Sequence, residues 1–341
     1  MPKSTKQPVV IIPNLNGGAE LLDAVNSLVA QTLVPHIIVV DNASTDDSVT
    51  KLQSAYPNVE LILHTTNKGY AGGVNPGLTR AIELGADYVA PFNDDAVADK
   101  QWLQKLVDAL DAQPQAGAAA CKVLTSDGRQ LDSTADYFTN WGLPYPRGRG
   151  EDDQQQYDTQ TDIFGASGAA SLYRVKALQE VGLLDEDFFA YYEDVDLSFR
   201  LQLAGWKVVY VPTARVYHHI GLTSGRMKGF TTYQTMKNLP LVTFKNVPSK
   251  YLWSVTWRLT LARSLFLLRA ISRGQGWYAF KGDFVATYLL FKKMPERRRI
   301  QATKKVSDDY IWSIFTHDLP PNATALRSLR ARWRKLTRTQ Q

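Results

Sequence analysis

The sequence of 341 residues holds a single cysteine, Cys121, which excludes a disulfide within the chain. One unpaired thiol is typical of a protein that works in a reducing compartment. The sequence also lacks any run of about 18 apolar residues, so we expect no helix that crosses a membrane. Its first residues, MPKSTKQP, have none of the apolar character of a secretory signal. These absences predict a cytoplasmic protein.

Two common nucleotide-binding motifs are missing as well. The sequence has neither the GxGxxG pattern of dinucleotide-binding folds nor a GxxxxGKS/T phosphate loop, which disfavours a dehydrogenase or a P-loop enzyme. The stretch NKGYAGG does hold Gly69, Gly72 and Gly73, and glycine lets a backbone approach a ligand closely. A plain loop is the alternative interpretation. In either case we expect a loop here that leads into a helix from Val74, closed by Gly85.

The sequence does contain ample apolar material for a core, because 44% of its residues are hydrophobic and 21% are charged. Short β-branched runs alternate with segments of helical spacing, which predicts an α/β domain with a mainly parallel sheet and helices on both faces. Four of the predicted strands end in polar clusters, at residues 14–17, 41–46, 67–73 and 93–95. Since ligands bind beyond the carboxyl ends of parallel strands, we expect the site there.

The charges divide the chain into two unlike parts. From Lys245 onward there are 20 Lys and Arg against 5 Asp and Glu. Helical spacing in residues 251–273 puts five apolar residues on one stripe: Trp253, Trp257, Leu261, Leu265 and Leu268. Three arginines fall on another face: Arg258, Arg269 and Arg273. This pattern is typical of a basic amphipathic helix with aromatic anchors, which binds an anionic membrane surface.

We therefore predict two domains, residues 1–240 and 241–341, of which the second is helical. Dimerisation is the alternative role for its amphipathic helix, so a homodimer is left open. No recognised nucleic-acid-binding module accompanies the basic charge, and we expect no nucleic-acid partner.

Acidic residues gather where chemistry or local structure would use them. Asp94 and Asp95 end a predicted buried strand, so they lie either at a solvated strand end or against a divalent cation. Asp41 either closes an Asx turn or accepts hydrogen bonds from a nucleotide. Residues 191–196, YYEDVD, hold three carboxylates within four positions. Acids favour a helix N-terminus, but crowding also raises the pKa of a carboxyl group and makes it a better base.

Seven stretches follow one another in the order IIPNLNG, VVDNASTDDS, NKGYAGG, FNDDAV, GASGAASLYR, DEDFFAYYEDVDLSFRLQLAGW and ARVYHH. In this order and spacing they resemble family 2 glycosyltransferases of the GT-A fold, especially the bacterial rhamnosyltransferases of cell-wall and surface polysaccharide synthesis. The resemblance spans about residues 8–220 and leaves the basic tail uncovered. It implies a GT-A domain that binds a nucleotide-diphosphate sugar.

The resemblance also implies roles for individual residues. Asp194 would be the general base, and Asp95 would bind Mn²⁺ or Mg²⁺. NDD stands in the place of the DXD motif, so Asn93 replaces its first acid. Asp41 would contact the nucleobase. The rest of the donor pocket would be formed by Pro13, Asn14, Asn16, Ser44, Asn67, Lys68, Gly69, Gly73, Asn93 and Asp94. The acceptor side would be lined by Ser167, Gly168 and Glu193.

Two histidines follow the last predicted strand of this region. A pair at a strand exit can reach a metal or a diphosphate, although a lone histidine is more often structural. Of the two we predict His219, rather than His218, as a metal ligand.

These parts together predict an inverting, metal-dependent glycosyltransferase on the inner face of the cell membrane. An inverting displacement needs one carboxylate base, and no second positioned nucleophile is evident in the motifs. The expected donor is dTDP-rhamnose and the expected acceptor a saccharide linked to a polyprenyl diphosphate. The alternatives are a hexosyltransferase that uses a donor such as UDP-glucose or UDP-galactose, and a non-catalytic nucleotide-sugar-binding scaffold at the membrane.

Overall fold

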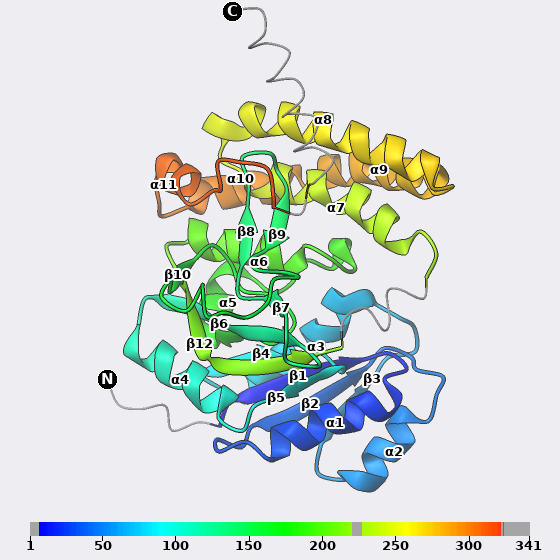
Figure 1. Ribbon diagram of the computed structural model, residues 1–341, viewed down its shortest axis with the longest axis vertical. Coiled ribbons are helices and arrows are strands. Elements are labelled where there is room, and N and C mark those ends of the chain that lie inside the picture. Colours follow the sequence, from blue (N-terminus) through cyan, green and yellow to red (C-terminus); the bar gives the residue numbers. More distant parts are fainter. Residues whose placement is uncertain (1–6, 220–226, 322, 324–341) are drawn as a thin grey trace, which may run out of the picture.

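The computed structural model, which describes residues 7–219, 227–321 and 323, contains one large sheet covered by helices (Figure 1). Its strands run in the order β10-β12-β6-β11-β4-β1-β2-β3. Their bounds are β1 (Val9–Asn14), β2 (His36–Asp41), β3 (Glu60–Leu63), β4 (Tyr88–Pro91), β6 (Ala116–Thr125), β10 (Asp162–Ile163), β11 (Leu172–Arg174) and β12 (Lys207–His218). β11 and β10 pair antiparallel with their neighbours, and the other pairs of this path are parallel. The predicted mainly parallel sheet is confirmed.

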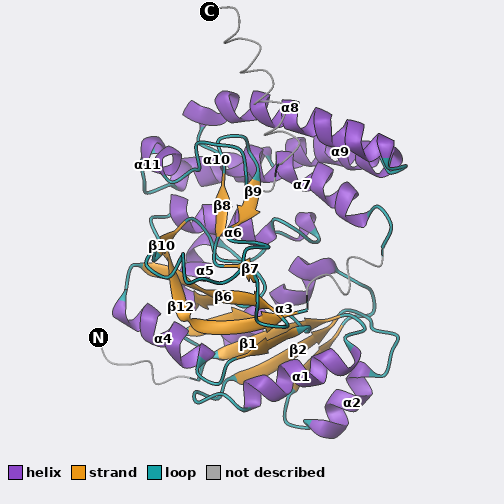
Figure 2. Ribbon diagram, in the orientation of Figure 1, coloured by secondary structure: helices purple, strands orange, loops and turns teal. Residues whose placement is uncertain are grey.

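Three shorter pieces complete the β structure (Figure 2). β5 (Ala96–Ala98) pairs antiparallel with β12, and β7 (Leu131–Ser133) pairs antiparallel with β6. β8 (Asp136–Phe138) and β9 (Pro144–Pro146) form a separate hairpin. This hairpin reaches the C-terminal region, where Thr139 forms an isolated parallel bridge with Thr316.

Helices cover both faces of the sheet. α1 (Gly18–Val29), α2 (Ser48–Ala55) and α4 (Trp102–Ala112) pack on one face, where Val10 and Ile12 of β1 are buried. α3 (Gly69–Glu83), α5 (Val175–Val181) and α6 (Glu193–Leu203) pack on the other, where Val9 and Ile11 are buried. Successive side chains of a strand point to opposite faces, so one β-branched run supplies both cores.

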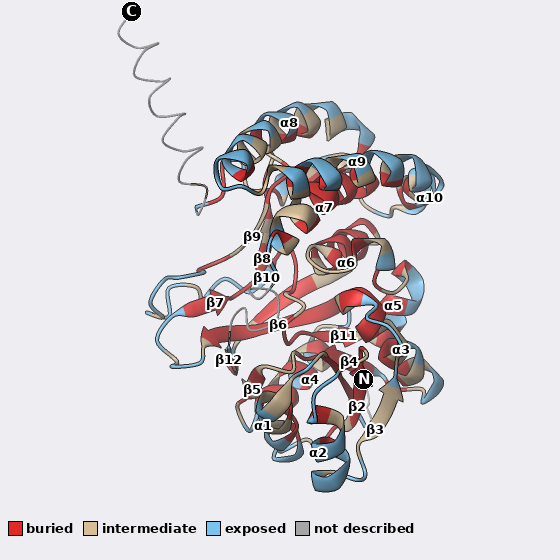
Figure 3. Ribbon diagram, turned by 90° about the vertical axis from the view of Figure 1, so that its right-hand side faces the viewer, coloured by how far each residue is buried: buried red, intermediate tan, exposed pale blue. Residues whose placement is uncertain are grey.

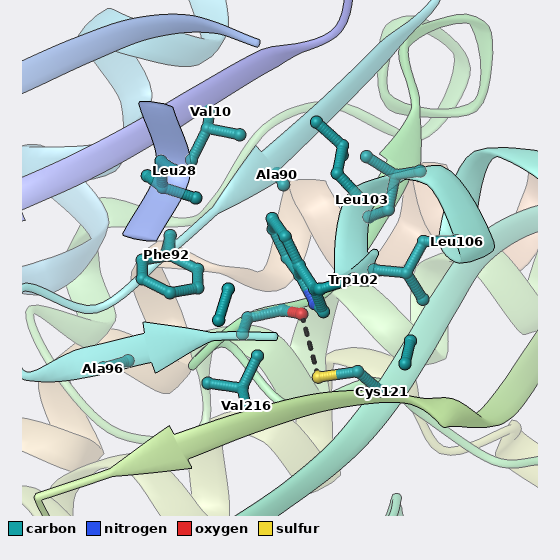
Figure 4. Packing of buried hydrophobic residues seen from close by; sticks show 14 of the residues in the cluster. Val10, Leu28, Ala90, Phe92, Ala96, Trp102, Leu103, Leu106, Cys121 and Val216 are labelled. Atoms are coloured by element: carbon teal, nitrogen blue, oxygen red, sulfur yellow. Dashed lines mark hydrogen bonds between the residues drawn. The ribbon is translucent and has the colours of Figure 1, made fainter. Parts of the chain in front are cut away.

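Figure 4 shows the core between the sheet and α4. The ring of Trp102 meets that of Phe92 edge-on, with 5.2 Å between the centroids. Cys121 donates its thiol hydrogen to the backbone oxygen of Ala170 at 3.2 Å. Burial raises the pKa of Cys121 to about 12. This thiol therefore behaves as a small core residue and not as a nucleophile.

The start of α3 differs from the prediction. The helix begins at Gly69 rather than at Val74, so Gly72 and Gly73 lie in its first turns and not in a loop. A Cβ at Gly77 would lie 2.5 Å from the side chain of Ile11, so α3 approaches β1 more closely than a larger residue allows. Close packing thus outweighs the low helix propensity of glycine. The predicted closure by Gly85, with φ +65°, is present.

The C-terminal region forms a helical layer over α6. Its helices are α7 (Phe230–Asn246), α8 (Ser249–Ser272), α9 (Gly276–Lys292), α10 (Met294–Thr303) and α11 (Asp308–Ser313). Figure 3 shows the buried residues of this layer turned toward the sheet and the exposed ones turned outward. The predicted boundary at residue 240 falls inside α7, and residues 324–341 lie outside the described part of the chain. Of the helices that are described, none is both long enough and apolar enough to cross a bilayer.

Candidate active site

The carboxyl ends of β1 and β2 meet in a buried polar cluster. Asn14 Nδ2 donates to Asp41 Oδ1 at 2.7 Å and to the hydroxyl oxygens of Ser44 and Ser48 at 3.0 and 3.1 Å. Asp41 also accepts from the backbone N–H and the hydroxyl of Ser44, at 3.0 and 2.5 Å. Three of the roughly four acceptor positions of a carboxylate are thus used. Asp41 therefore closes the turn after β2, and its contact with a nucleobase stays a prediction.

Two asparagines order the neighbouring loops. Asn16 has a φ of +57°, which asparagine tolerates better than most residues. Its backbone N–H donates to Ser44 Oγ at 2.9 Å, and its Oδ1 accepts from the N–H of Thr45 at 2.7 Å. Asn67 Oδ1 accepts from the N–H of Gly69 at 2.8 Å, at the start of α3. Both carboxamides therefore hold backbone at the carboxyl edge of the sheet.

The start of α3 is tied to β2 by Asn42. Asn42 Nδ2 donates to the carbonyl oxygen of Gly69 at 2.9 Å, and its Oδ1 accepts from the N–H of Lys68 at 3.3 Å. A Cβ at Gly73 would lie 2.4 Å from Asn42 Nδ2 and 3.2 Å from Pro13. The residues of β1, β2 and α3 that are predicted to bind the nucleotide sugar thus lie at one edge of the sheet.

Asn93, Asp94 and Asp95 follow β4 at the same edge. Asp94 Oδ2 lies 3.5 Å from the N–H of Leu15 and is only weakly bonded to it. Burial, and then the charge of Asp95, raise the pKa of Asp94 to about 7. Asp95 Oδ1 is buried and lies 2.9 Å from His218 Nε2, a contact outside hydrogen-bond geometry. Two carboxylates that repel each other in a buried place are what a cation would stabilise.

His218, rather than His219, turns its side chain toward Asp95. Its Nδ1 lies 2.9 Å from Asp132 Oδ2, and its Nε2 lies 3.1 Å from Asn93 Nδ2. Burial by itself would lower the pKa of His218, but the hydrogen bond with Asp132 and the nearby carboxylate of Asp95 raise it to about 9. His219 is exposed, and its backbone N–H donates to the carbonyl oxygen of Asp95 at 2.9 Å. A metal-binding role of the His219 side chain stays a prediction.

The two carboxylates fit a divalent cation that is coordinated by protein oxygens and by phosphate oxygens together. Asp94 and Asp95 offer carboxylate oxygens, the ligands that Mg²⁺ and Mn²⁺ prefer. Across residues 7–219 and 227–321, no group of three His, Cys, Asp or Glu side chains forms a closed metal site. A cation here would therefore need oxygen atoms from a bound ligand.

Asp132 links this histidine to an arginine of the segment after β9. Arg149 Nη2 lies 2.9 Å from Asp132 Oδ1, and Arg149 Nε donates to the carbonyl oxygen of Asp132 at 3.1 Å. The positive charge of Arg149 also reaches Asp136 and Asp194, where it opposes the effect of burial on their pKa values. A row of charged groups thus leads from Asp95 toward Asp194.

Asp194 lies in the first turn of α6. Its Oδ2 accepts from the N–H of Gly168 at 2.9 Å, and its Oδ1 from the N–H of Val195 at 2.8 Å. Burial raises the pKa of Asp194, and these two N–H groups oppose that rise. The hydroxyl of Tyr70 donates to the carbonyl oxygen of Gly168. The predicted acceptor residues Ser167 and Gly168 therefore lie beside the predicted base.

Two further acids crowd Asp194. Burial and the charge of Asp194 raise the pKa values of Glu193 and Asp136 well above the usual range. Glu193 Oε2 is buried without a hydrogen-bond partner. Because backbone N–H groups favour the charged form of the carboxyl that accepts them, the bonds from Gly168 and Val195 favour the ionised form of Asp194. Burial and the charge of Asp194 favour the neutral forms of Glu193 and Asp136.

The segment of the predicted metal-binding acids is bonded to the segment that holds the predicted base. The N–H of Asn93 donates to the carbonyl oxygen of Ala169 at 2.9 Å, and the adjacent Gly168 holds Asp194. Tyr70 lines a small cavity together with Gly168 and Asp194. Burial, and then the charges of Glu193, Asp194 and, more weakly, Asp94, raise the pKa of Tyr70.

The third acid of YYEDVD has a structural task. Asp196 is fully buried and accepts from Arg200 Nε at 2.9 Å, Lys245 Nζ at 3.0 Å and Asn246 Nδ2 at 2.7 Å. The motif therefore serves two purposes at once, with Asp194 on the site and Asp196 in a buried ion-pair cluster.

The backbone before Asp194 is strained and is held from α7. Three residues have left-handed φ angles between +64° and +73°: Phe189, Tyr191 and Tyr192. Such angles cost about 1–2 kcal/mol per residue for side chains other than glycine. Asn238 Nδ2 donates to three carbonyl oxygens of this loop at 2.8–3.0 Å, those of Phe188, Ala190 and Tyr191. Asn238 thus helps to fix the loop that leads to the base.

Several residues of the site escaped sequence reasoning: Asn42, Tyr70, Asp132, Asp136, Arg149 and Asn238. Asn42 and Tyr70 stand inside two of the quoted motifs, so a signal existed for them. The others come from β7, β8, the segment after β9 and α7, where no motif marks them.

Comparison with known proteins identifies the family of this chain. Residues 9–182 match Glycosyl transferase family 2. The N-acetylglucosaminyl-diphospho-decaprenol L-rhamnosyltransferase of Mycobacterium tuberculosis is 34% identical over 209 residues, which cover 56% of this chain and 68% of that protein.

Two solved structures share the GT-A arrangement. GalNAc-T7 with UDP, GalNAc and Mn²⁺ has a TM-score of 0.56 at 16% identity and covers 72% of this chain and 48% of its own. TarS 1–349 of S. aureus with UDP-GlcNAc has a TM-score of 0.55 at 15% identity and covers 93% of this chain and 95% of its own. At such identities the likeness concerns the fold alone.

Proposed function

This chain belongs to glycosyl transferase family 2, and from that premise we propose that it transfers L-rhamnose, with inversion, from dTDP-rhamnose to a saccharide on a polyprenyl diphosphate. Membership of the family makes the chain a glycosyltransferase. The sugar and the acceptor are proposed because the mycobacterial relative, 34% identical, is named for rhamnose transfer onto a decaprenyl-diphosphate-linked sugar.

One observation carries the proposal. The two acids after β4 and the base at the start of α6 are joined through two adjacent residues, Ala169 and Gly168. A donor diphosphate at Asp95 would therefore direct its sugar toward Asp194. This is the arrangement that a single displacement at the anomeric carbon requires.

We assign the following roles in the reaction to residues of this chain. Asp194, whose charged form the N–H groups of Gly168 and Val195 favour, accepts the proton of the acceptor hydroxyl as its oxygen attacks. Glu193, whose pKa is raised by burial and by the charge of Asp194, would line the acceptor side. Asp41 offers its remaining acceptor position to the nucleobase, and the backbone around Lys68 and Gly69 borders the nucleotide.

A divalent cation would be held by Asp95, with Asp94 beside it. When bound, Mn²⁺ or Mg²⁺ would neutralise charge on the departing diphosphate. GalNAc-T7, which shares the fold, was solved together with UDP, GalNAc and Mn²⁺. His218 and Asp132 would keep Asp95 in position, as residues behind a metal ligand commonly do.

The test is sugar transfer onto a synthetic prenyl-diphosphate N-acetylglucosamine, with dTDP-rhamnose, UDP-glucose and UDP-galactose offered in turn. We expect transfer from dTDP-rhamnose, and loss of about 10²–10⁴-fold in kcat for Asp194→Asn, because the proton acceptor is removed. Asp108→Asn, which changes an exposed acid of α4, is the matched control. Transfer from a UDP-hexose alone would replace rhamnose by a hexose. Undiminished turnover of Asp194→Asn would refute the assignment of the base.

A further inference from the structure

The outer surface of α8 and α9 carries an unusual number of large apolar side chains. They recur mostly every three or four residues and are between 45% and 78% exposed: Trp253, Trp257, Leu261, Leu268, Ile271, Trp277, Phe280, Phe284, Tyr288 and Phe291. We refer to these ten side chains as the apolar face. Soluble surfaces rarely gather so many, and such a patch marks a place of interaction.

The apolar face points away from the rest of the molecule. The inner sides of both helices are buried and carry small or medium residues, among them Val255 and Ala262 of α8 and Ala279 and Ala286 of α9. α8 and α9 pack on α7 and on each other, and no helix or strand of the described residues covers their outer sides (Figure 3). Of the stripe predicted for α8, Leu265 packs inward and is only partly exposed. α9, which the predicted stripe did not include, contributes five members of the apolar face.

The charges on α8 and α9 are mostly of one sign. Arg269 and Lys281 are exposed on these helices, Arg273 follows directly after α8, and Lys292 is exposed but pairs with Asp187 at 2.7 Å. Asp283 is the one acid between residues 249 and 293, and it is paired with Arg263. The surface therefore combines aromatic and aliphatic side chains with a basic margin, which complements the headgroups and the acyl boundary of an anionic bilayer.

We propose that the apolar face of α8 and α9 seats this protein in the interfacial layer of an anionic membrane. A second copy of the chain is the weaker occupant, because a two-fold contact would bring the same basic margins together. α7 lies between this face and α6, so the protein would bind the membrane with the helix of Asp194 one layer away. The inference goes beyond the proposed function, since lipid binding needs neither donor nor acceptor.

Sedimentation of the full-length protein with vesicles tests the inference. We expect binding to mixed phosphatidylcholine–phosphatidylglycerol vesicles, and weaker binding to pure phosphatidylcholine. The combined change Trp253→Ser, Trp277→Ser and Phe284→Ser should weaken binding to the mixed vesicles by about tenfold or more. Arg269→Gln, Arg273→Gln and Lys281→Gln together should remove most of the preference for anionic lipid.

Matched controls change exposed residues elsewhere. Val29→Ser, Val34→Ser and Leu84→Ser remove exposed apolar side chains from the opposite end of the molecule. Lys51→Gln, Lys100→Gln and Lys176→Gln remove exposed charge from the sheet domain. Both control sets should bind vesicles as the wild type does. Equal loss in a control set and in its test set would overturn the inference.

A measurement on the unaltered protein guards against variants that fold badly. Trp253, Trp257 and Trp277 are exposed, so their fluorescence should shift to shorter wavelength when anionic vesicles are added. An unchanged spectrum without sedimentation would overturn the inference. So would a dimer, seen by analytical ultracentrifugation without lipid, that the apolar substitutions dissociate, because a second copy would then occupy the face.

Discussion

Lys245 of α7 lies against Asp196 of α6, with 3.0 Å between Nζ and Oδ2, and neither side chain is exposed. Lys245 Nζ also lies 2.6 Å from Asp185 Oδ2 and 2.8 Å from Glu296 Oε1. Asp196 stands two residues after Asp194, so this buried cluster joins the C-terminal helices to the helix of the proposed base. The C-terminal layer is therefore part of the scaffold of the site.

Replacing Lys245 by methionine should lower the free energy of unfolding of the protein. The change keeps much of the side-chain volume but leaves three carboxylates without their shared cation. Breaking a buried ion pair on one side costs about 3–5 kcal/mol. Urea denaturation should report a loss of this size in the free energy of unfolding. Lys100→Met, at an exposed position, should change it by less than about 0.5 kcal/mol.

Asp185 should make stability depend on pH in the acid range. Burial opposes ionisation, but the charges of and hydrogen bonds from Lys245 and Lys293 lower the pKa of Asp185 from 3.8 to about 2. A lowered pKa in the folded state stabilises the fold above the unfolded pKa, and this contribution is lost as the pH falls through the folded value. The loss should lie between pH 3.8 and about 2.

The variant Asp185→Asn isolates this contribution. Its free energy of unfolding, measured by urea denaturation from pH 5 downward, should fall less steeply through that window than that of the wild type. Parallel curves for the two proteins would contradict the role given to Asp185.

Asn238 should act on turnover more than on donor binding. Asn238→Asp keeps the shape of the side chain but replaces the donor by an acceptor that repels the carbonyl oxygens of Phe188, Ala190 and Tyr191. The loop would shift, and small misplacements of a catalytic group cost up to about 100-fold in rate. We expect kcat to fall by about tenfold or more, with the KM for the donor nearly unchanged.

A neighbour on the same helix provides the control for Asn238. Gln234 is also buried, but its side-chain oxygen has no hydrogen-bond partner. Gln234→Leu should leave kcat close to the wild-type value. A fall in kcat that is the same for both variants would mean that α7 is merely destabilised.

The two histidines after β12 should differ in their effect on metal dependence. The imidazole of His218 contacts Asp95 and Asp132, whereas that of His219 is exposed. Removing a group that orients a metal ligand typically costs about 10–100-fold in metal affinity. His218→Ala should therefore raise the Mn²⁺ concentration needed for half-maximal activity by such a factor. If His219→Ala has the larger effect, the ligand predicted from the sequence is the correct one.

Local patterns in the sequence determined the elements and the edge of the sheet that holds the site. The apolar runs that form β1, β2 and β4 are buried on both faces, so each run by itself predicts a strand. Because these strands are parallel, the polar residues that follow them lie at one edge of the sheet. The predicted start of α3 was wrong. The glycine-rich stretch suggested a loop, whereas close packing of Gly77 on Ile11 favours a helix.

The sequence by itself thus determined the fold class and the family. Only the tertiary structure decided which side chain of each motif faces the site. Neighbouring residues of the same type, such as His218 and His219 or Asp194 and Asp196, look alike in the sequence but make different contacts in the fold. Asp132, Asp136, Arg149 and Asn238 reach the site through contacts between segments far apart in the chain, and nothing local in the sequence encodes such contacts.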